Sequence, residues 1–251
     1  KHVEEMFREA KVKYKVSEES LRKLAELDDY VIEHFRLAFG NRIVKQLEES
    51  CARLNEPRIK SGEELAKDKA FFDWIECFNA YSPEASAIAE AEWIKPDIDT
   101  SDWEEKQFNE LTLSRVPGIA WYRKEVEIPS EWVDSDLLVY FDSLNDEDEV
   151  FFDGIKIGET TCRTREWWDT PRMYKVDKVN VTSVNHTIAV RIKNHKSVGG
   201  FIGEAFVRSF NHYGRMCISE GAWKQKQEFV IDFSSFPARP DHVPDFTNIT
   251  N

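Results

Sequence analysis

The sequence lacks the features that identify a membrane-spanning chain or a protein organised by cysteine chemistry. No apolar run approaches the roughly 20 residues that a helix needs to cross a bilayer, so a membrane is not an expected partner. The four cysteines are widely and irregularly spaced without a C-x-x-C pair, which argues against the usual zinc and redox motifs. Buried free thiols are therefore expected, with a disulfide between Cys51 and Cys77 as the alternative.

The sequence also lacks a motif that would supply an active site of its own. G-x-S-x-G, H-E-x-x-H and the phosphate-binding G-x-x-x-x-G-K-[ST] do not occur. Asp241 and His242 are adjacent in a proline-rich segment, and neighbouring side chains of extended backbone point to opposite sides. They therefore cannot form the relay of a hydrolase triad, and we predict no catalytic residue. An independent enzyme built on scattered carboxylates such as Glu204 and Glu220 is the last alternative.

Positive charge is in short supply. The chain has 34 Lys and Arg residues against 47 Asp and Glu residues, which gives a formal net charge of −13 at pH 7. Nucleic acids and anionic membranes bind clustered basic residues, so neither is an expected partner. An anionic sugar would need a local basic pocket that acts against the field of the whole chain.

The chain begins at Lys1 without an initiator Met and without a signal peptide. Its start is therefore expected to be a processing boundary or a cut within a longer chain. The compartment is unknown, and a periplasmic or secreted parent protein is compatible with the sequence.

The periodicity of apolar residues divides the chain into three parts. Residues 1–92 carry apolar side chains at helical spacing and predict a helical lead-in segment. At about Trp93 the spacing changes to alternation, and residues 93–236 predict eight or so short antiparallel strands, as in a sandwich. Residues 237–251 contain three prolines and predict an extended tail. The predicted fold class is α+β: a small helical segment followed by an antiparallel β-sandwich.

The sequence indicates where one helix of the lead-in segment begins. Ser61 and Glu64 form a capping box, in which each residue satisfies a backbone donor of the other. The helix that follows carries an aromatic stripe, and we expect it to be core rather than a ligand site: Phe71, Trp74 and Phe78.

The strand region contains its own local signals. Asp153 and Gly154 stand between β-branched and aromatic residues and tolerate the positive φ angles of a type I′ turn, which predicts a β-hairpin. Ile188, Val190 and Ile192 alternate with Thr187, Ala189, Arg191 and Lys193, so the apolar set is expected on one face of a strand.

These strands resemble a known β-sandwich. GIAWYRKEVEIPSEW from Gly118, then DEVFFDGIKIG, PRMYKV and HTIAVRI look like the galactose-binding-like jelly roll of sialate O-acetylesterases and of glycoside hydrolase family 2 enzymes. The segment Trp93–Leu113 is similar to the W-x-x-P-D-x-D-x-S-x-W lead-in that both families share. VGGFIGE and GRMCISEGAWKQKQEF resemble the esterases more closely. The resemblance covers residues 91–245.

The resemblance implies the non-catalytic β-sandwich portion of a sialate O-acetylesterase-like carbohydrate esterase. That family carries its triad in G-Q-S-N and D-x-x-H motifs of an SGNH hydrolase domain, and this chain has neither motif. The implied partners are the catalytic SGNH domain of the parent protein and an acetylated glycan such as a sialoglycan, which the sandwich would frame or contact. The alternatives are the sugar-binding domain of a family 2 glycoside hydrolase and a freestanding carbohydrate-binding module.

One loop is a candidate for ligand binding because of its aromatic and basic residues. It contains Arg163, Arg165, Trp167 and Trp168. An indole face can pack on the apolar face of a sugar ring, and Arg can bind hydroxyl or carboxylate groups. Packing of a Trp against the open end of the sandwich is the more frequent use of such a residue.

Two further stretches are candidates. Gly199 and Gly200 would let the backbone approach a partner domain or a substrate closely, with an ordinary turn as the alternative. The acidic run Asn145–Glu149 has enough oxygen ligands for Ca²⁺, although short charged runs more often form solvated loops. No other cofactor and no defined metal site are predicted.

Overall fold

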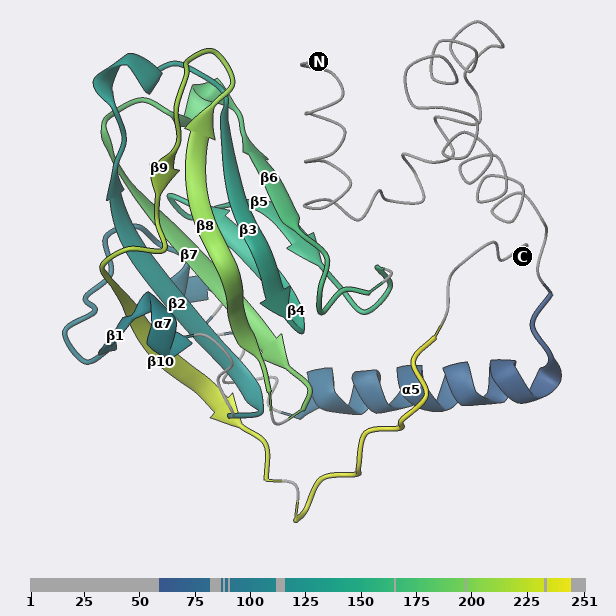
Figure 1. Cartoon of the computed structure of the whole chain (residues 1–251). Helices are drawn as coiled ribbons and strands as arrows, with labels where there is room; N and C mark the ends of the chain where they lie inside the picture. The colour runs from purple at the N-terminus through teal and green to yellow at the C-terminus, as the bar shows by residue number, and fades with distance from the viewer. Residues whose placement is uncertain are drawn as a thin grey trace, which may run out of the picture. The chain divides into compact units, whose positions relative to one another are not determined.

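Two antiparallel sheets lie face to face in the computed structural model of this chain (Figure 1). The structure describes residues 59–81, 87, 89, 91–111, 116–164, 166–196, 198–232 and 234–244. Residues 66–245 form one compact unit. The predicted β-sandwich with a helix on its N-terminal side is confirmed. The predictions for residues 1–58 lie outside the described residues, and the division at residue 92 stays a prediction.

The larger sheet contains six strands in the order β1-β10-β2-β7-β4-β5. Every neighbouring pair is antiparallel. Its strands are β1 (Glu104–Gln107), β2 (Gly118–Glu127), β4 (Glu147–Phe152), β5 (Ile155–Thr160), β7 (Asn185–Asn194) and β10 (Ala222–Val230).

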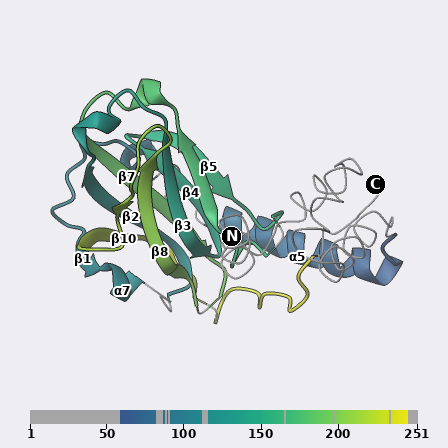
Figure 2. The same ribbon diagram turned by 45° about the horizontal axis from the view of Figure 1, so that its top comes forward.

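The smaller sheet contains four antiparallel strands in the order β6-β3-β8-β9. A second view shows β3 and β8 crossing in front of β2 and β7 of the larger sheet (Figure 2). The described residues thus form ten strands, against the eight or so expected. The strands of the smaller sheet are β3 (Leu137–Asn145), β6 (Arg172–Val176), β8 (Gly200–Ser209) and β9 (Met216–Cys217). Short helical turns occupy α7 (Phe108–Leu111), Ser130–Trp132 and Lys178–Asn180.

Alternating apolar positions of the strands build the core between the sheets. On β7, Ile188, Val190 and Ile192 are buried in this core, as their spacing predicts. The same rule holds on β3, where alternate residues also belong to the core: Leu137, Val139 and Phe141.

The predicted hairpin turn joins β4 to β5. Asp153 and Gly154 have φ angles of 47° and 80°, the two positive values that a type I′ turn needs. The Asp153 carboxylate also holds the turn against β7, because it accepts the Thr187 N–H at 2.7 Å and lies 2.6 Å from His186 Nδ1.

Helix α5 (Gly62–Ala80) begins at the predicted capping box. The Ser61 N–H donates to Glu64 Oε2 at 2.9 Å, and the Glu64 N–H donates to Ser61 Oγ at 3.2 Å. The helices in the described part are too short or too polar to cross a membrane. The aromatic stripe is buried in a second apolar cluster with Ile119 of β2, as expected of core residues: Phe71, Trp74 and Phe78.

The segment that follows the sandwich returns to α5. Trp74 Nε1 donates to the Pro237 carbonyl at 2.8 Å, and the Trp74 and Phe236 rings meet edge to face with centroids 5.7 Å apart. His242 Nε2 lies 2.5 Å from Asp68 Oδ1. The segments before and after the sandwich therefore contact each other, and we call these contacts the neck.

The acidic run at the start of β4 is buried, and the expectation of a solvated loop is wrong there. Asp146, Glu147 and Asp148 have no more than 4% of their surface exposed. Asp148 Oδ1 accepts a hydrogen bond from Arg172 Nε at 2.6 Å, with both side chains fully buried. A residue 24 positions along the chain thus compensates the charge, which the local sequence does not reveal.

Further polar groups surround this ion pair. Arg172 Nη2 donates to the carbonyls of Leu144 and Asp146, the second at 3.0 Å. Asp148 Oδ2 accepts the Tyr174 hydroxyl at 2.6 Å. Burial raises the pKa of Asp148, and Arg172 opposes that shift. Each charge is therefore hydrogen-bonded as well as paired, as buried ions require.

We predict that Arg172→Met lowers the free energy of unfolding by about 3–5 kcal/mol, because it leaves Asp148 buried without a counter-ion. Urea unfolding measures the change. Lys175→Met on the same strand is the matched control: Lys175 forms solvent-exposed ion pairs with Asp136 and Asp177, and we expect little effect. Adding Asp148→Leu to Arg172→Met should restore part of the loss. Equal effects of the two single variants would contradict the structural role of the pair.

Candidate functional site

The aromatic loop that the sequence singles out lies between β5 and β6. The Trp167 side chain has no exposed surface, and its ring centroid lies 5.8 Å from that of Phe71 on α5. It therefore has no free face for a sugar ring, and its burial fits the packing alternative.

The other residues of this loop are less enclosed. Arg163 is exposed, with its guanidinium 4.7 Å from the centroid of the Phe72 ring. Trp168 is half-buried, and its carbonyl accepts the Ser143 hydroxyl at 2.7 Å. Arg165 lies outside the described residues. Ligand contact by Arg163 and Trp168 stays a prediction.

The two glycines pack against their own chain. A Cβ on Gly199 would lie 2.4 Å from Asn194 Cγ and 2.7 Å from the Asn145 carbonyl oxygen. Gly200 has a φ of 109° and pairs with Asn145 at the start of β8. Close packing within the sandwich accounts for Gly199 and a positive φ for Gly200, and their contact with a ligand stays a prediction.

Several ionisable groups meet where α5 covers the sandwich. His195 is fully buried against the rings of Trp74 and Phe78, and neither of its ring nitrogens has a hydrogen-bond partner in the described part of the chain. Burial lowers the pKa of His195 well below its ordinary value. Asp146 Oδ2 accepts the His195 N–H at 2.8 Å, and burial raises the pKa of Asp146 to about 6.

The cysteine in this region is not a nucleophile at neutral pH. Burial, with help from Glu147, raises the pKa of the Cys162 thiol to about 12, so the reactive thiolate is scarce. Cys162 is buried as expected, whereas Cys77 and Cys217 are exposed, which corrects the expectation for those two. Cys51 lies outside the described residues.

The carboxylates of the acidic run do not converge on one point. Each carboxylate has its own nitrogen partner. Asp146 accepts the His195 N–H, and Glu147 accepts the Cys162 N–H. Asp148 pairs with Arg172, and Glu149 pairs with both Arg191 and Lys156. Among the residues that the structure describes, no three His, Cys, Asp or Glu side chains are grouped to hold a metal ion. Calcium binding at this run stays a prediction from the sequence.

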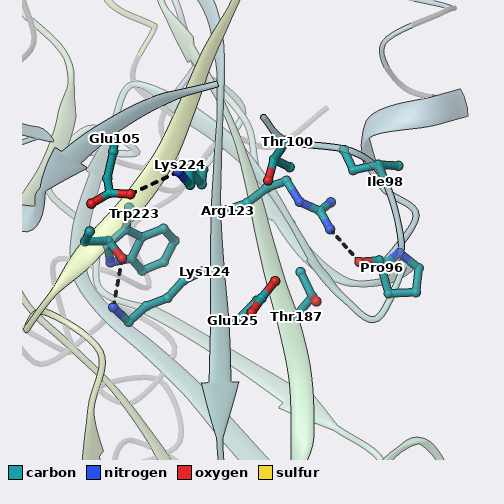
Figure 3. A pocket seen from close by; sticks show the side chains of 11 residues that line it. Pro96, Ile98, Thr100, Glu105, Arg123, Lys124, Glu125, Thr187, Trp223 and Lys224 are labelled. Atoms are coloured by element: carbon teal, nitrogen blue, oxygen red, sulfur yellow. Dashed lines mark hydrogen bonds and ion pairs between the residues drawn. The ribbon is translucent and has the colours of Figure 1, made fainter. Parts of the chain in front are cut away.

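A polar hollow of about 230 Å³ lies beside β2 (Figure 3). The ladder between β2 and β10 ends at the Arg123–Lys224 pair, whereas β2 continues beside β7 to Glu127. Consecutive residues of a strand point to opposite faces. The gap in the ladder lets both Arg123 and Lys124 line the hollow.

The segment before β1 forms the opposite side of the hollow. Arg123 holds it there, with Nη1 donating to the Trp93 carbonyl at 2.6 Å and Nη2 to the Pro96 carbonyl at 3.1 Å. Ile98 adds an apolar edge to the lining, and Thr187 of β7 contributes a hydroxyl group.

Sequence reasoning missed this hollow. Arg123 and Thr187 are 64 positions apart and come together only because β2 pairs with β7, where Arg123 stands opposite Ala189. No spacing motif in the sequence predicts such a site. The resemblance places Trp93 and Pro96 in a lead-in segment, but it does not indicate that their carbonyls bind a buried arginine.

No protein-family description and no curated protein sequence matches this chain. Solved structures with partial similarity include three glycoside hydrolases. A β-glucuronidase of Ruminococcus gnavus is 14% identical with a TM-score of 0.30, over 46% of this chain and 31% of its own. An α-L-rhamnosidase of Streptomyces avermitilis is 20% identical with a TM-score of 0.39, over 59% of this chain and 14% of its own.

The third is a β-glucuronidase from glycoside hydrolase family 2, 18% identical with a TM-score of 0.33, over 41% of this chain and 12% of its own. The matched region therefore spans less than a third of each of these proteins. The esterase parent rests on the sequence resemblance alone.

We predict that Asp146→Asn stabilises the chain most at high pH. The pKa of Asp146 is about 6 in the folded state against an ordinary 3.8, so the folded state binds a proton first as the pH falls. Wild-type stability should therefore rise between pH 7 and pH 4 relative to the variant, by at most about 3 kcal/mol.

Urea unfolding of both proteins at several pH values measures this difference. Asp136→Asn is the control with the opposite slope, because the bond with Lys175 lowers the pKa of the half-buried Asp136. The stabilising effect of Asp136 is lost as the pH falls through that lowered pKa. Parallel pH profiles for wild type and Asp146→Asn would contradict the burial of an ionisable carboxyl group.

Proposed function

We propose that this chain is a non-catalytic, sugar-contacting β-sandwich of a larger carbohydrate-processing enzyme. The catalytic residues of that enzyme would lie on another domain, and the sandwich would contact the glycan beside it. The observation that carries the proposal is how the polar groups of the described residues are used. The buried carboxylates hold the fold, whereas the Thr187 hydroxyl and the Glu125 carboxylate line the hollow beside β2.

The buried carboxylates support this division. Glycoside hydrolysis needs two carboxyl groups that can reach the substrate. The Glu228 side chain is buried, and its two oxygens accept hydrogen bonds from Arg191 at 2.9 Å each. Glu149 accepts from Arg191 at 2.8 Å and Asp148 from Arg172 at 2.6 Å. Such carboxylates stabilise strands and cannot serve as acid and base.

The contacts of the neck support an accessory module whose two chain connections are held together. Contacts between α5 and the segment after β10 fix the two connections of the sandwich side by side. A sandwich joined to its parent in this way can keep a constant orientation toward a neighbouring domain. The esterase and the family 2 glycosidase of the sequence resemblance would both use the sandwich as an accessory to catalysis.

The flanking coding sequence separates these two parents. A G-Q-S-N motif upstream and a D-x-x-H motif downstream would indicate the esterase, because these motifs carry its triad. A glycosidase domain downstream would indicate the family 2 parent.

The purified chain should bind a saccharide weakly and turn over none. Calorimetric titration with a panel of neutral and acidic monosaccharides tests the first statement, and we expect dissociation constants in the millimolar range, roughly −4 kcal/mol. Release of nitrophenol from nitrophenyl acetate and nitrophenyl glycosides tests the second. Turnover in proportion to the protein concentration would overturn the non-catalytic role, and silence across the whole panel would overturn sugar contact.

A further inference from the structure

The connection between β8 and β9 exposes two aromatic rings that the fold does not use. Tyr213 is completely exposed, and Phe210 has 51% of its surface exposed. Neither ring contacts another ring or a cation in the described part of the chain. Tyr81, the other exposed aromatic residue among those described, packs its ring against Phe229 and Phe236. The rings of Tyr213 and Phe210 are therefore available to an outside partner.

This connection lies at the end of the sandwich away from α5 (Figure 1). Leu137 begins β3 and pairs with Ser209, the residue just before the connection. Asn145 ends β3 at the other end of the sandwich, next to Asp146, which accepts the N–H of His195 beneath α5. The two rings are therefore remote from the contacts of the neck.

Hydrogen bonds hold the connection in one shape. Ser209 is fully buried, and its hydroxyl oxygen accepts the Asn211 N–H at 3.1 Å and lies 3.2 Å from His212 Nδ1. The Phe210 N–H donates to the Asp136 carbonyl at 3.0 Å, which fastens the connection to the segment before β3. A ligand therefore meets an ordered turn and does not have to order it, which lowers the entropic cost of binding.

The amount of aromatic surface favours a small ligand. An aromatic side chain can bury about 150–250 Å², and because Phe210 is only half exposed the two rings offer roughly 300 Å². A stable interface between two proteins needs roughly 800 Å² on each partner. The rings supply less than half of that area, so they suit one or two sugar rings better than a second copy of this chain.

The polar groups beside the rings suit a neutral ligand. Residues 209–214 contain no Asp, Glu, Lys or Arg, and the Arg215 that follows pairs with Glu204 at 3.0 Å. The Asn211 amide and His212 Nε2 have no hydrogen-bond partner among the residues that the structure describes. An amide and an imidazole can both bind hydroxyl groups, which donate and accept. An aromatic ring can pack on the apolar face of a sugar.

We propose that the connection between β8 and β9 binds a neutral saccharide, with one sugar ring stacked on Tyr213. Phe210 provides a second apolar contact, and Asn211 and His212 bind hydroxyl groups. This assignment rests on the proposed function and deepens it, because it names the part of the sandwich that contacts the glycan.

Saturation-transfer NMR of the full chain with neutral hexasaccharides of glucose, mannose, galactose and xylose tests the assignment. We expect at least one of them to bind. Tyr213→Ala should weaken that saccharide at least about fivefold, because one aromatic contact is lost. Tyr213→Phe keeps the ring and should retain most of the affinity. A folded Tyr213→Ala variant with wild-type affinity would overturn the site.

Two controls make this test specific. Met173→Ala removes another exposed apolar side chain, from β6, and should leave the affinity unchanged; an equal loss would overturn the role of Tyr213. Hexagalacturonate should bind more weakly than the neutral saccharide, and equal or tighter binding would overturn the neutral ligand. Because Tyr213 is exposed, the melting temperature of Tyr213→Ala should lie within about 2 °C of the wild type.

The remaining outcomes separate this site from the proposed function. Saccharide binding that Tyr213→Ala retains would support the proposed function and overturn this site alone. Silence of the wild-type chain with every saccharide would overturn both. Sedimentation velocity tests self-association: a dimer that Tyr213→Ala abolishes would assign the rings to contact between two copies and overturn the saccharide.

Discussion

The relation between the two sheets depends on the buried ion pair of Asp148 and Arg172. Asp148 belongs to β4 of the larger sheet and Arg172 to β6 of the smaller one, so the pair joins the layers along one side. Desolvation of two charges costs several kcal/mol per ion, which the carbonyls of Leu144 and Asp146 and the Tyr174 hydroxyl help to offset. A one-residue slip of either strand would bury both charges unpaired, so the pair fixes register.

The same use of charge recurs on the outer face of the larger sheet. Arg191 bridges Glu149 and Glu228, and Trp121 Nε1 donates to Glu228 at 2.7 Å. These bonds connect β4, β7, β2 and β10 across the sheet. The hollow at Arg123 lies at another place in the same sheet, where the ladder between β2 and β10 ends.

Local patterns in the sequence predict the sandwich well. The Asp153-Gly154 turn needs only two neighbouring residues with positive φ, and the capping box at Ser61 needs only one helical turn. The acidic run at Asp148 was misjudged because its compensating arginine is distant in sequence and adjacent only in the fold. The hollow is harder still to predict from the sequence. Strand pairing and backbone carbonyls surround Arg123, and the position of a backbone carbonyl cannot be inferred from residue type.

The contacts of the neck also determine how the sandwich responds to tension. β1 and β10, the first and last strands of the sandwich, are antiparallel neighbours, with Glu104 opposite Gln225. Their outer ends lie on the same side, so a pull on the two connections would unzip this ladder one hydrogen bond at a time. The Trp74–Pro237 and Asp68–His242 contacts lie between that ladder and the flanking chain. A pulling force therefore acts on these two contacts first, and they break before the strands of the sheets separate.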